Sequence, residues 1–172
     1  LGTSARPQVS IWDGIIMGGG VGISVLGKFR VATEKSLFAM PETAIGLFPD
    51  VGSSSWLPHL KDGFGQYIGM TGARLGAADL LYTGIATHFV NSDRLEDLEK
   101  ALVGGVTSTD PLKATSEVKA ILDSFQTTSP DDARATMMKN EDVITQCFGN
   151  APKGVEDVMQ RSVLSVPETM SM

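Results

Sequence analysis

The chain has 172 residues, of which 42% are hydrophobic and 20% charged, and its formal net charge is −6. This length and apolar fraction support one ordinary folded domain and exclude wholesale disorder. Residues 1–90 carry equal numbers of acidic and basic side chains, so the net charge lies in residues 91–172, and we expect no broad nucleic-acid-binding surface. The single cysteine excludes an internal disulfide, and no apolar run approaches the roughly 20 residues that span a bilayer, so no membrane partner is expected.

The first 48 residues predict two copies of one short unit, in which two strands are followed by a helical segment. Polar or glycine-containing turns separate apolar runs of strand length, and a glycine triplet opens an apolar run of helix length. The predicted strands are Val9–Trp12, Ile15–Met17, Phe29–Ala32 and Leu37–Met40, and the predicted helical segments are Gly18–Leu26 and Thr43–Leu47. Repetition of such a unit predicts an α/β fold in which the units stack as a spiral.

From Gly52 onward the pattern becomes helical. The predicted helices cover residues 53–60, 62–70, 77–82, 94–103, 112–125, 131–138, 143–148 and 155–164, with a short strand or extended link over residues 86–90. Gly104-Gly105 is expected to break the helix that precedes it. We therefore divide the chain into a spiral core over residues 1–104 and a helical C-terminal region over residues 105–172.

The candidate functional residues lie between Met17 and Gly52. Gly18, Gly19 and Gly20 expose backbone N–H groups at the start of a helix, where the helix dipole also favours developing negative charge. Glu42 follows a strand-like run, and Asp50 follows Pro49 at a second turn. Two carboxylates near such donors indicate acid–base or nucleophilic chemistry on an activated carbonyl.

Each of these pieces also has a purely structural interpretation. A glycine triplet can mark a tight turn, Glu42 can simply favour the dipole of a first helical turn, and Asp50 can cap a helix. The individual signals leave these alternatives open. Their order and spacing over the whole stretch are the more specific observation.

Other kinds of site have little support in the sequence. His59 and His88 lie in separate segments without carboxylates at ligand spacing, so structural roles are expected for both and no metal is expected. Ser53–Ser55 follow a glycine, but Trp56 occupies the place where a nucleophile elbow needs its second glycine. The glycine triplet also lacks the later glycine of a dinucleotide-binding fingerprint.

The segment M-G-G-G-V-G-I-S-V-L-G-K-F-R-V-A-T-E-K-S-L-F-A-M-P-E-T-A-I-G-L-F-P-D-V-G resembles the crotonase (enoyl-CoA hydratase/isomerase) superfamily and, within it, the 3-hydroxyisobutyryl-CoA hydrolases. The resemblance continues through L-P-H-L, M-T-G-A-R-L and G-I-A-T-H-F-V and covers about residues 8–92. It implies a core of repeated strand–strand–helix units and a CoA thioester substrate. It also implies that two backbone N–H groups hold the thioester oxygen: one belongs to Gly19, and the other is expected in an earlier segment that this chain does not contain.

The resemblance also implies roles for the carboxylates. Hydratases of the superfamily place one glutamate two residues after the glycine triplet, where this chain has Gly22, and a second at the position of Glu42. Glu42 together with Asp50, and without a carboxylate at residue 22, is the hydrolase-like arrangement. It implies that Glu42 is the main catalytic group, either as a nucleophile that forms a mixed anhydride or as a base for water. Asp50 would orient the substrate hydroxyl or the attacking water, and no cofactor is expected beyond the CoA of the substrate.

Two functions of different classes follow from the resemblance. The first is an acyl-CoA thioester hydrolase of valine breakdown in the mitochondrial matrix. The second is a hydrolase-like structural component of a mitochondrial small ribosomal subunit, which needs no catalysis. We place the enzyme first because Gly19, Glu42 and Asp50 are all present. A homo-oligomer or a larger assembly is compatible with both.

The ends of the chain carry one further expectation. The sequence opens on Leu1 and stops at Met172 without a capping signal, so we expect the middle portion of a longer protein. Strands that normally precede this portion would then be missing, and the apolar runs V-S-I-W and F-R-V-A are expected to be exposed.

Overall fold

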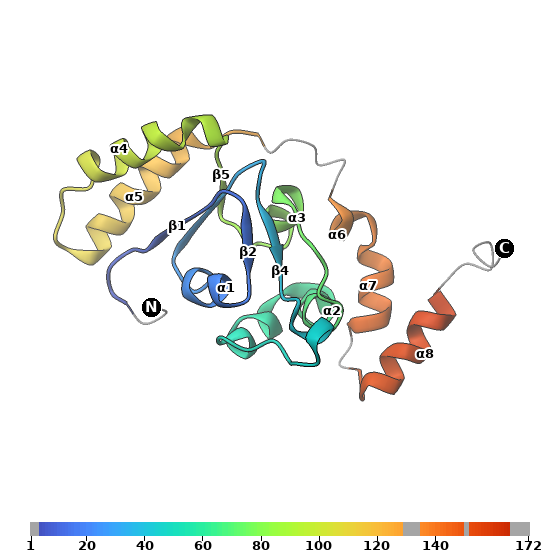
Figure 1. Cartoon of the computed structure of the whole chain (residues 1–172). Coiled ribbons are helices and arrows are strands. Elements are labelled where there is room, and N and C mark those ends of the chain that lie inside the picture. Colours follow the sequence, from blue (N-terminus) through green and yellow to red (C-terminus); the bar gives the residue numbers. More distant parts are fainter. Residues whose placement is uncertain (1–3, 129–134, 150–151, 166–172) are drawn as a thin grey trace.

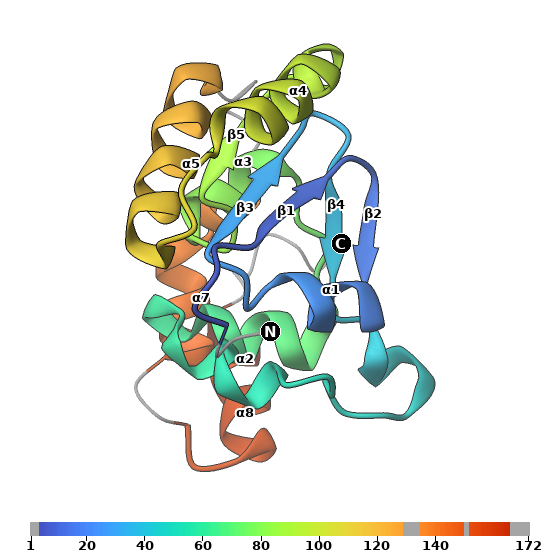
Figure 2. The same ribbon diagram turned by 90° about the vertical axis from the view of Figure 1, so that its left-hand side faces the viewer.

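The structure is a computed structural model that describes residues 4–128, 135–149 and 152–165, with the side chains of residues 164–165 left out. Its five strands form two small parallel sheets (Figures 1 and 2). The three-stranded sheet has the order β1-β3-β5 and the two-stranded sheet has the order β2-β4. The strands are β1 Val9–Trp12, β2 Ile15–Met17, β3 Phe29–Ala32, β4 Leu37–Ala39 and β5 His88–Phe89.

The parallel pairing confirms the predicted repeat. The first strand of one unit pairs with the first strand of the next, with Val9 opposite Phe29, and the second strands pair likewise, with Ile15 opposite Leu37. Each pair of strands leads into a helical segment, α1 over Gly19–Ser24 and the 3-10 helix η1 over Glu42–Ile45. The chain therefore returns to the same two sheets with each unit, as a stacked spiral requires.

The remaining elements are helical and surround the sheets (Figure 1). The short 3-10 helices are η2 Ser53–Ser55, η3 Leu57–His59, η4 Lys61–Gly63 and η5 Ser92–Arg94. The α-helices are α2 Phe64–Thr71, α3 Ala77–Tyr82, α4 Leu95–Gly105, α5 Pro111–Phe125, α6 Thr136–Lys139, α7 Glu141–Phe148 and α8 Val155–Ser165. In Figure 1 the α4–α5 pair lies on one side of the strands and α6–α8 on the other.

Two predicted helices differ in form or extent from the observed elements. Gly104-Gly105 does not break α4, which runs through Gly105, because α5 packs so closely there that a Cβ on Gly105 would lie 2.9 Å from the Ile121 side chain. The helix expected over residues 53–60 is two 3-10 turns, which Trp56 separates with a φ of −126°. The start of the helix expected at residue 131 lies outside the described residues, and α6 begins at Thr136.

Two hydrophobic clusters fill the interior. The larger one joins the strands to α2, α3 and α7 and is centred on Phe38, Phe64 and Phe89. The smaller one joins β3 to α4 and α5 and includes Val31 and Leu122. Both clusters take residues from both sides of residue 104, and the proposed division of the chain at that point remains a prediction.

The expected exposure holds for one residue of the first apolar run. In V-S-I-W, Ile11 is 39% exposed but Trp12 is only 3% exposed, and β1 pairs on one side only within the described residues. The expectation for F-R-V-A is wrong, since Phe29 is 5% exposed and Val31 is fully buried. β3 is the central strand of its sheet, and α4 and α5 cover it.

Polar contacts fasten the outer helices to this core. The buried carboxylate of Asp79 in α3 accepts a hydrogen bond of 2.7 Å from the backbone N–H of Met137 in α6, and burial raises the pKa of Asp79. His88 has the structural role predicted for it, since its ring lies 2.8 Å from the Thr87 hydroxyl and 3.3 Å from the Asp123 carboxylate of α5. These contacts connect α6 to α3 and α5 to β5, and so join helices that follow residue 104 to elements that precede it.

Candidate active site

The glycine triplet forms the turn that the sequence predicts. Gly18 has a φ of 51°, which favours glycine, and it is the N-cap of α1. Hydrogen bonding within the helix begins with the N–H groups of Val21 and Gly22, which donate to the Gly18 carbonyl at 3.0 and 3.2 Å. Gly19 and Gly20 come before these donors in the chain, so their N–H groups take no part in the hydrogen bonding of the helix, and both residues are exposed. Because α1 has only six residues, the individual N–H groups matter more here than the helix dipole.

The structure brings Glu42 against this turn. Glu42 is the first residue of η1, and its side chain is directed inward, with 7% of the residue exposed. A Cβ built on Gly18 would lie 3.7 Å from Glu42 Oε1, an ordinary van der Waals distance, so the carboxylate lies directly beside the turn. Glu42 Oε2 is buried and has no hydrogen-bond partner among the described residues. Such an atom reduces the stability of the fold and is typical of functional positions.

Asp50 is in a different environment. It is exposed and lies in the loop that leads from η1 to η2. Its carbonyl accepts a hydrogen bond of 2.9 Å from the Ser53 N–H across a tight turn whose central residues are Val51 and Gly52. The N-cap of η2 is Gly52, and no side chain caps this helix, so the structure does not support the interpretation of Asp50 as a helix cap.

The turn after Asp50 touches α1. A Cβ built on Gly22 would lie 2.4 Å from the Cβ of Val51, so the two residues are in direct contact. Gly22 is one helical turn beyond Gly18. Val51, the neighbour of Asp50, therefore contacts the same short helix as Glu42 does. The same contact leaves no room for the glutamate that the resemblance implies for hydratases at residue 22.

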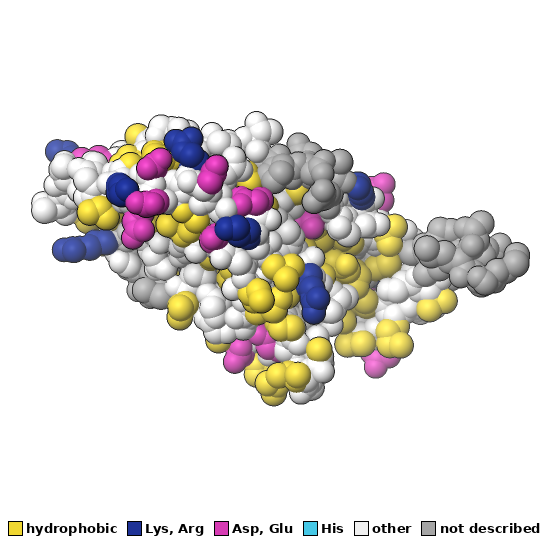
Figure 3. Space-filling view, turned by 45° about the horizontal axis from the view of Figure 1, so that its top comes forward, with side chains coloured by type: hydrophobic (Ala, Val, Ile, Leu, Met, Phe, Trp, Pro, Cys, Tyr) yellow, Lys and Arg dark blue, Asp and Glu magenta, His cyan; other side chains and the backbone are white. Residues whose placement is uncertain are grey.

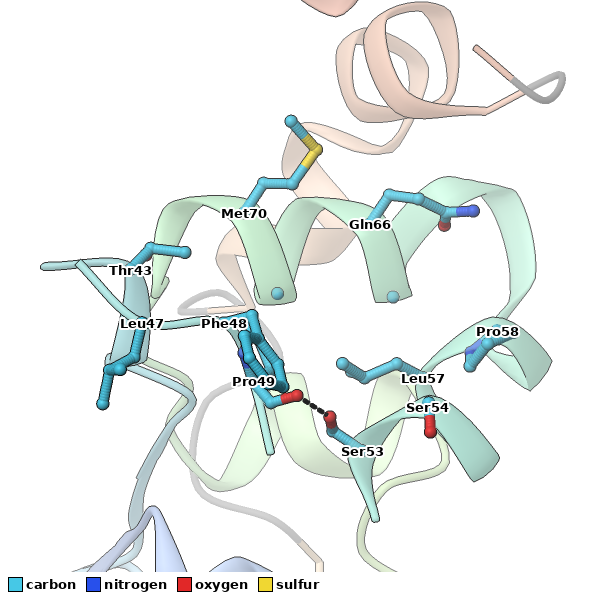
Figure 4. A pocket seen from close by; sticks show the side chains of 12 residues that line it. Thr43, Leu47, Phe48, Pro49, Ser53, Ser54, Leu57, Pro58, Gln66 and Met70 are labelled. Carbon is cyan, nitrogen blue, oxygen red and sulfur yellow. Dashed lines mark hydrogen bonds between the residues drawn. The ribbon is translucent and has the colours of Figure 1, made fainter. Parts of the chain in front are cut away.

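Figure 4 shows a cavity of about 420 Å³ that the sequence reasoning missed. It lies between η1 and its following loop, η2–η3 and α2, and its lining is mostly apolar. Thr43, which follows Glu42, and Pro49, which precedes Asp50, both line it. The sequence signal for it is the apolar run Leu47-Phe48-Pro49. In the structure this run lies in a loop, and the hydrophobic side chains of Leu47 and Phe48 are 56% and 75% exposed.

In residues 4–128, 135–149 and 152–165, no group of three His, Cys, Asp or Glu side chains could hold a metal ion. No helix in the same residues is long and apolar enough to cross a bilayer. The candidate site consists of the glycine turn with Glu42 and of the Asp50 loop.

Two curated relatives of this chain are named for the same activity. The chain is 51% identical over 148 residues to "Probable 3-hydroxyisobutyryl-CoA hydrolase 3" of Arabidopsis thaliana, a match that covers 86% of this chain and 38% of that protein. It is 44% identical over 164 residues to "3-hydroxyisobutyryl-CoA hydrolase, mitochondrial" of Homo sapiens, which covers 93% of this chain and 40% of that protein. The chain thus spans about two fifths of the length of these relatives.

A solved structure and a family profile agree with these matches. The crystal structure of a carnitinyl-CoA dehydratase from Mycobacterium thermoresistibile is 30% identical, with a TM-score of 0.77, over 96% of this chain and 44% of that one. The profile described as Enoyl-CoA hydratase/isomerase matches residues 1–168. The fold is therefore the crotonase fold that the resemblance implies, and the chain belongs to the enoyl-CoA hydratase/isomerase family.

Proposed function

We propose that the protein carrying this chain is a 3-hydroxyisobutyryl-CoA hydrolase, which cleaves a 3-hydroxyacyl-CoA thioester in valine breakdown. The observation that carries the proposal is the buried, unpartnered Oε2 of Glu42 beside the glycine turn. A carboxylate in this position is free to act on a substrate atom, and the curated relatives carry the same activity in their names.

In this proposal the N–H of Gly19, flanked by Gly18 and Gly20, donates a hydrogen bond to the thioester oxygen. Charge that develops on that oxygen in the tetrahedral transition state is stabilised by such donors. The second donor would come from the segment that precedes the matched region in the longer relatives. The apolar cavity behind Leu47 and Pro49 offers space for the apolar part of the substrate.

Glu42 can complete the reaction in two ways. As a nucleophile, its carboxylate attacks the thioester carbon, the C–S bond breaks, CoA leaves as a thiolate that takes up a proton, and water then hydrolyses the mixed anhydride. As a base, Glu42 takes a proton from the attacking water, and the same C–S bond breaks without a covalent intermediate. Asp50 would orient the substrate hydroxyl or the water.

The test of this function uses the full-length protein that carries the chain. Wild type should hydrolyse 3-hydroxyisobutyryl-CoA, and Glu42→Gln, which keeps the shape but removes the charge, should not. Hydroxylamine added during turnover should convert a mixed anhydride into a hydroxamate on Glu42, which peptide mass spectrometry detects. Turnover by Glu42→Gln at the wild-type rate would refute the assignment, whereas absence of the hydroxamate from an active enzyme would favour the base mechanism.

We also propose that the protein acts in the mitochondrial matrix, because several of the curated relatives are named as mitochondrial. Association with the mitochondrial small ribosomal subunit is the second candidate. Sedimentation of a mitochondrial extract separates the two, since a soluble thioesterase peak supports the enzyme and co-migration with ribosomal particles supports the structural role. The unpartnered Glu42 carboxylate favours the enzyme, because a structural protein gains nothing from it.

A further inference from the structure

The turn that follows Asp50 has an unusual backbone. Val51 has a φ of 46°, and among the described residues the only other non-glycine residue with a positive φ is Asp62. Gly52 follows with a φ of 83°, so both central residues of the Asp50–Ser53 turn lie in the left-handed region. Turns of this mirror-image kind normally use glycine, asparagine or aspartate, and a β-branched residue there is a genuine outlier. Local preference therefore does not explain valine at this position.

Packing against α1 does explain it. The position of a Cβ on Gly22 is only 2.4 Å from Val51 Cβ, 2.9 Å from Val51 Cγ2 and 3.0 Å from the Val51 carbonyl oxygen. Val51 thus occupies the space that any larger residue at position 22 would need. Strained backbone persists where the surrounding structure holds it in place, and such places are often functional.

The other side of Asp50 is held as well. The carbonyl of Pro49 accepts a hydrogen bond of 2.5 Å from the Ser53 hydroxyl, and the Pro49 ring lies against α2, where a Cβ on Gly69 would be 3.5 Å from its Cγ. Asp50 is therefore fixed between Pro49, which contacts α2, and Val51, which contacts α1. The residue is exposed, but its backbone is anchored on both sides.

We propose that Val51 is a positioning residue for Asp50, and that its contact with Gly22 sets the place of the Asp50 carboxylate relative to Glu42. The helix α1 then positions both carboxylates, because Glu42 contacts it at its N-cap, Gly18, and the Asp50 turn contacts it at Gly22. This inference rests on the proposed function, in the form in which Asp50 orients the substrate hydroxyl.

A size exchange between the two contact residues tests the inference in the full-length protein. Gly22→Ala adds a methyl group where there is no space, so the Asp50 turn must shift, and we expect kcat/KM for 3-hydroxyisobutyryl-CoA to fall about 10-fold or more. The loss for isobutyryl-CoA, which has no hydroxyl to orient, should be clearly smaller. Gly22→Ala combined with Val51→Gly removes the clashing Cβ and Cγ2 and should recover most of the preference for the hydroxylated substrate.

Two controls separate positioning from folding. Val51→Gly alone keeps the backbone conformation available and should lower the preference for the hydroxylated substrate even if Gly22→Ala does not fold. Asp62→Gly replaces the other residue with a positive φ, and it should leave substrate preference unchanged whatever it does to the melting temperature.

The outcomes distinguish this inference from the proposed function. An inactive wild-type protein, or one in which Glu42→Gln has no effect, refutes the function itself. If wild type is active and depends on Glu42, the inference is overturned when the losses of Gly22→Ala and Val51→Gly multiply in the double variant. It is also overturned when both substrates are affected equally.

Discussion

The two carboxylates of the candidate site are held by different means. Glu42 emerges from the repeated strand–strand–helix unit, is buried, and contacts the glycine turn. Asp50 lies on a surface loop that also exposes Leu47 and Phe48, at 56% and 75%. The general fold therefore determines where Glu42 is, whereas contacts of the two neighbouring residues, Pro49 with α2 and Val51 with α1, hold the backbone at Asp50. Changes near Glu42 should affect the chemical step, and changes near Asp50 should affect orientation of the substrate.

A second contrast separates this site from the far end of the molecule. Figure 3 shows acidic and basic side chains interspersed over α4 and α5. Lys100–Glu96 and Lys119–Asp123 are ion pairs between residues four apart, which stabilise an exposed helix face. Residues 46–49, which precede Asp50, carry no charged side chain, and Leu47 and Phe48 among them are exposed, a pattern typical of surfaces that contact a ligand or more protein.

The largest effect is expected when residues 1–172 are expressed alone, because the structure around both carboxylates then loses support. β1 and β2 each pair on one side only within the described residues, and Ile15 and Ile23 are 76% and 67% exposed. Residues 1–172 expressed alone should be poorly soluble or molten and inactive. In the proposed function the second oxyanion donor lies outside these residues, and loss of one donor costs about 10²–10³ in rate.

This expectation is checked by thermal unfolding and thioester cleavage. The comparison sample is the same chain extended by the segment that precedes the matched region in a curated relative. The extended protein should show a cooperative transition and turnover. A sharp transition with substantial turnover by residues 1–172 alone would contradict the expectation.

Glu42→Gln should give the next largest effect, a loss of thioester hydrolysis of at least about 10²-fold, because the general base or nucleophile is removed. The melting temperature should stay the same or rise, since the buried charge lacks a partner for Oε2. Loss of activity without loss of stability is the result that identifies a functional carboxylate. A marked fall in melting temperature would show that Glu42 supports the fold instead.

Asp50→Asn should have a smaller effect that depends on the substrate. Loss of a hydrogen-bonding partner costs about 1–3 kcal/mol, so kcat/KM for 3-hydroxyisobutyryl-CoA should fall accordingly, with less effect on isobutyryl-CoA. Steady-state kinetics with both substrates measures the difference. Equal losses would mean that Asp50 serves the reaction in general and does not recognise the hydroxyl.

The smallest effect concerns a polar cluster on the surface. The Lys61 ammonium lies 2.8 Å from Glu141, and the Tyr82 hydroxyl also donates to Glu141. Hydrogen bonds from Lys61 and then Tyr82 lower the pKa of Glu141 in the folded state. The ionised Glu141 therefore stabilises the fold at pH values above its pKa in the unfolded state, and this stabilisation is lost as the pH falls through its pKa in the folded state.

Glu141→Gln should accordingly flatten the acid side of the stability profile, while activity at neutral pH stays unchanged. Chemical denaturation across the acid range measures this, with wild type as the reference. The ion pair is exposed, so the change at neutral pH should be small. An equal acid dependence in both proteins would show that the cluster contributes nothing.

Much of this arrangement could be predicted from the sequence because it depends on local pattern. The alternation of strand-length runs and turns located β1 to β4, and the glycine triplet located the start of α1. The continuation of α4 through Gly105 could not be predicted, because it depends on the contact with Ile121 in another helix. The same is true of Val51, whose conformation depends on Gly22 and contradicts its local preference.

The candidate site shows the same limit. Sequence order placed Gly19, Glu42 and Asp50 near one another along the chain. It could not show that Glu42 is buried and Asp50 exposed, because burial depends on which strands and helices pack together. Nor could it show the cavity, whose walls come from η1 and its loop, from η2–η3 and from α2.

The parallel register of the strands also bears on how the chain folds. Val9 pairs with Phe29 and Ile15 with Leu37, so each pairing closes a loop of about twenty residues, for which the entropic cost is modest. β5 joins β3 through the pairs Val31–His88 and Ala32–Phe89, and this pairing closes a much longer loop that contains η1–η4, α2 and α3. Loops of such different length favour early association of β1 to β4 and later addition of β5 with the α4–α5 pair. The glycine turn and Glu42 would then meet before most of the helical part of the chain has packed.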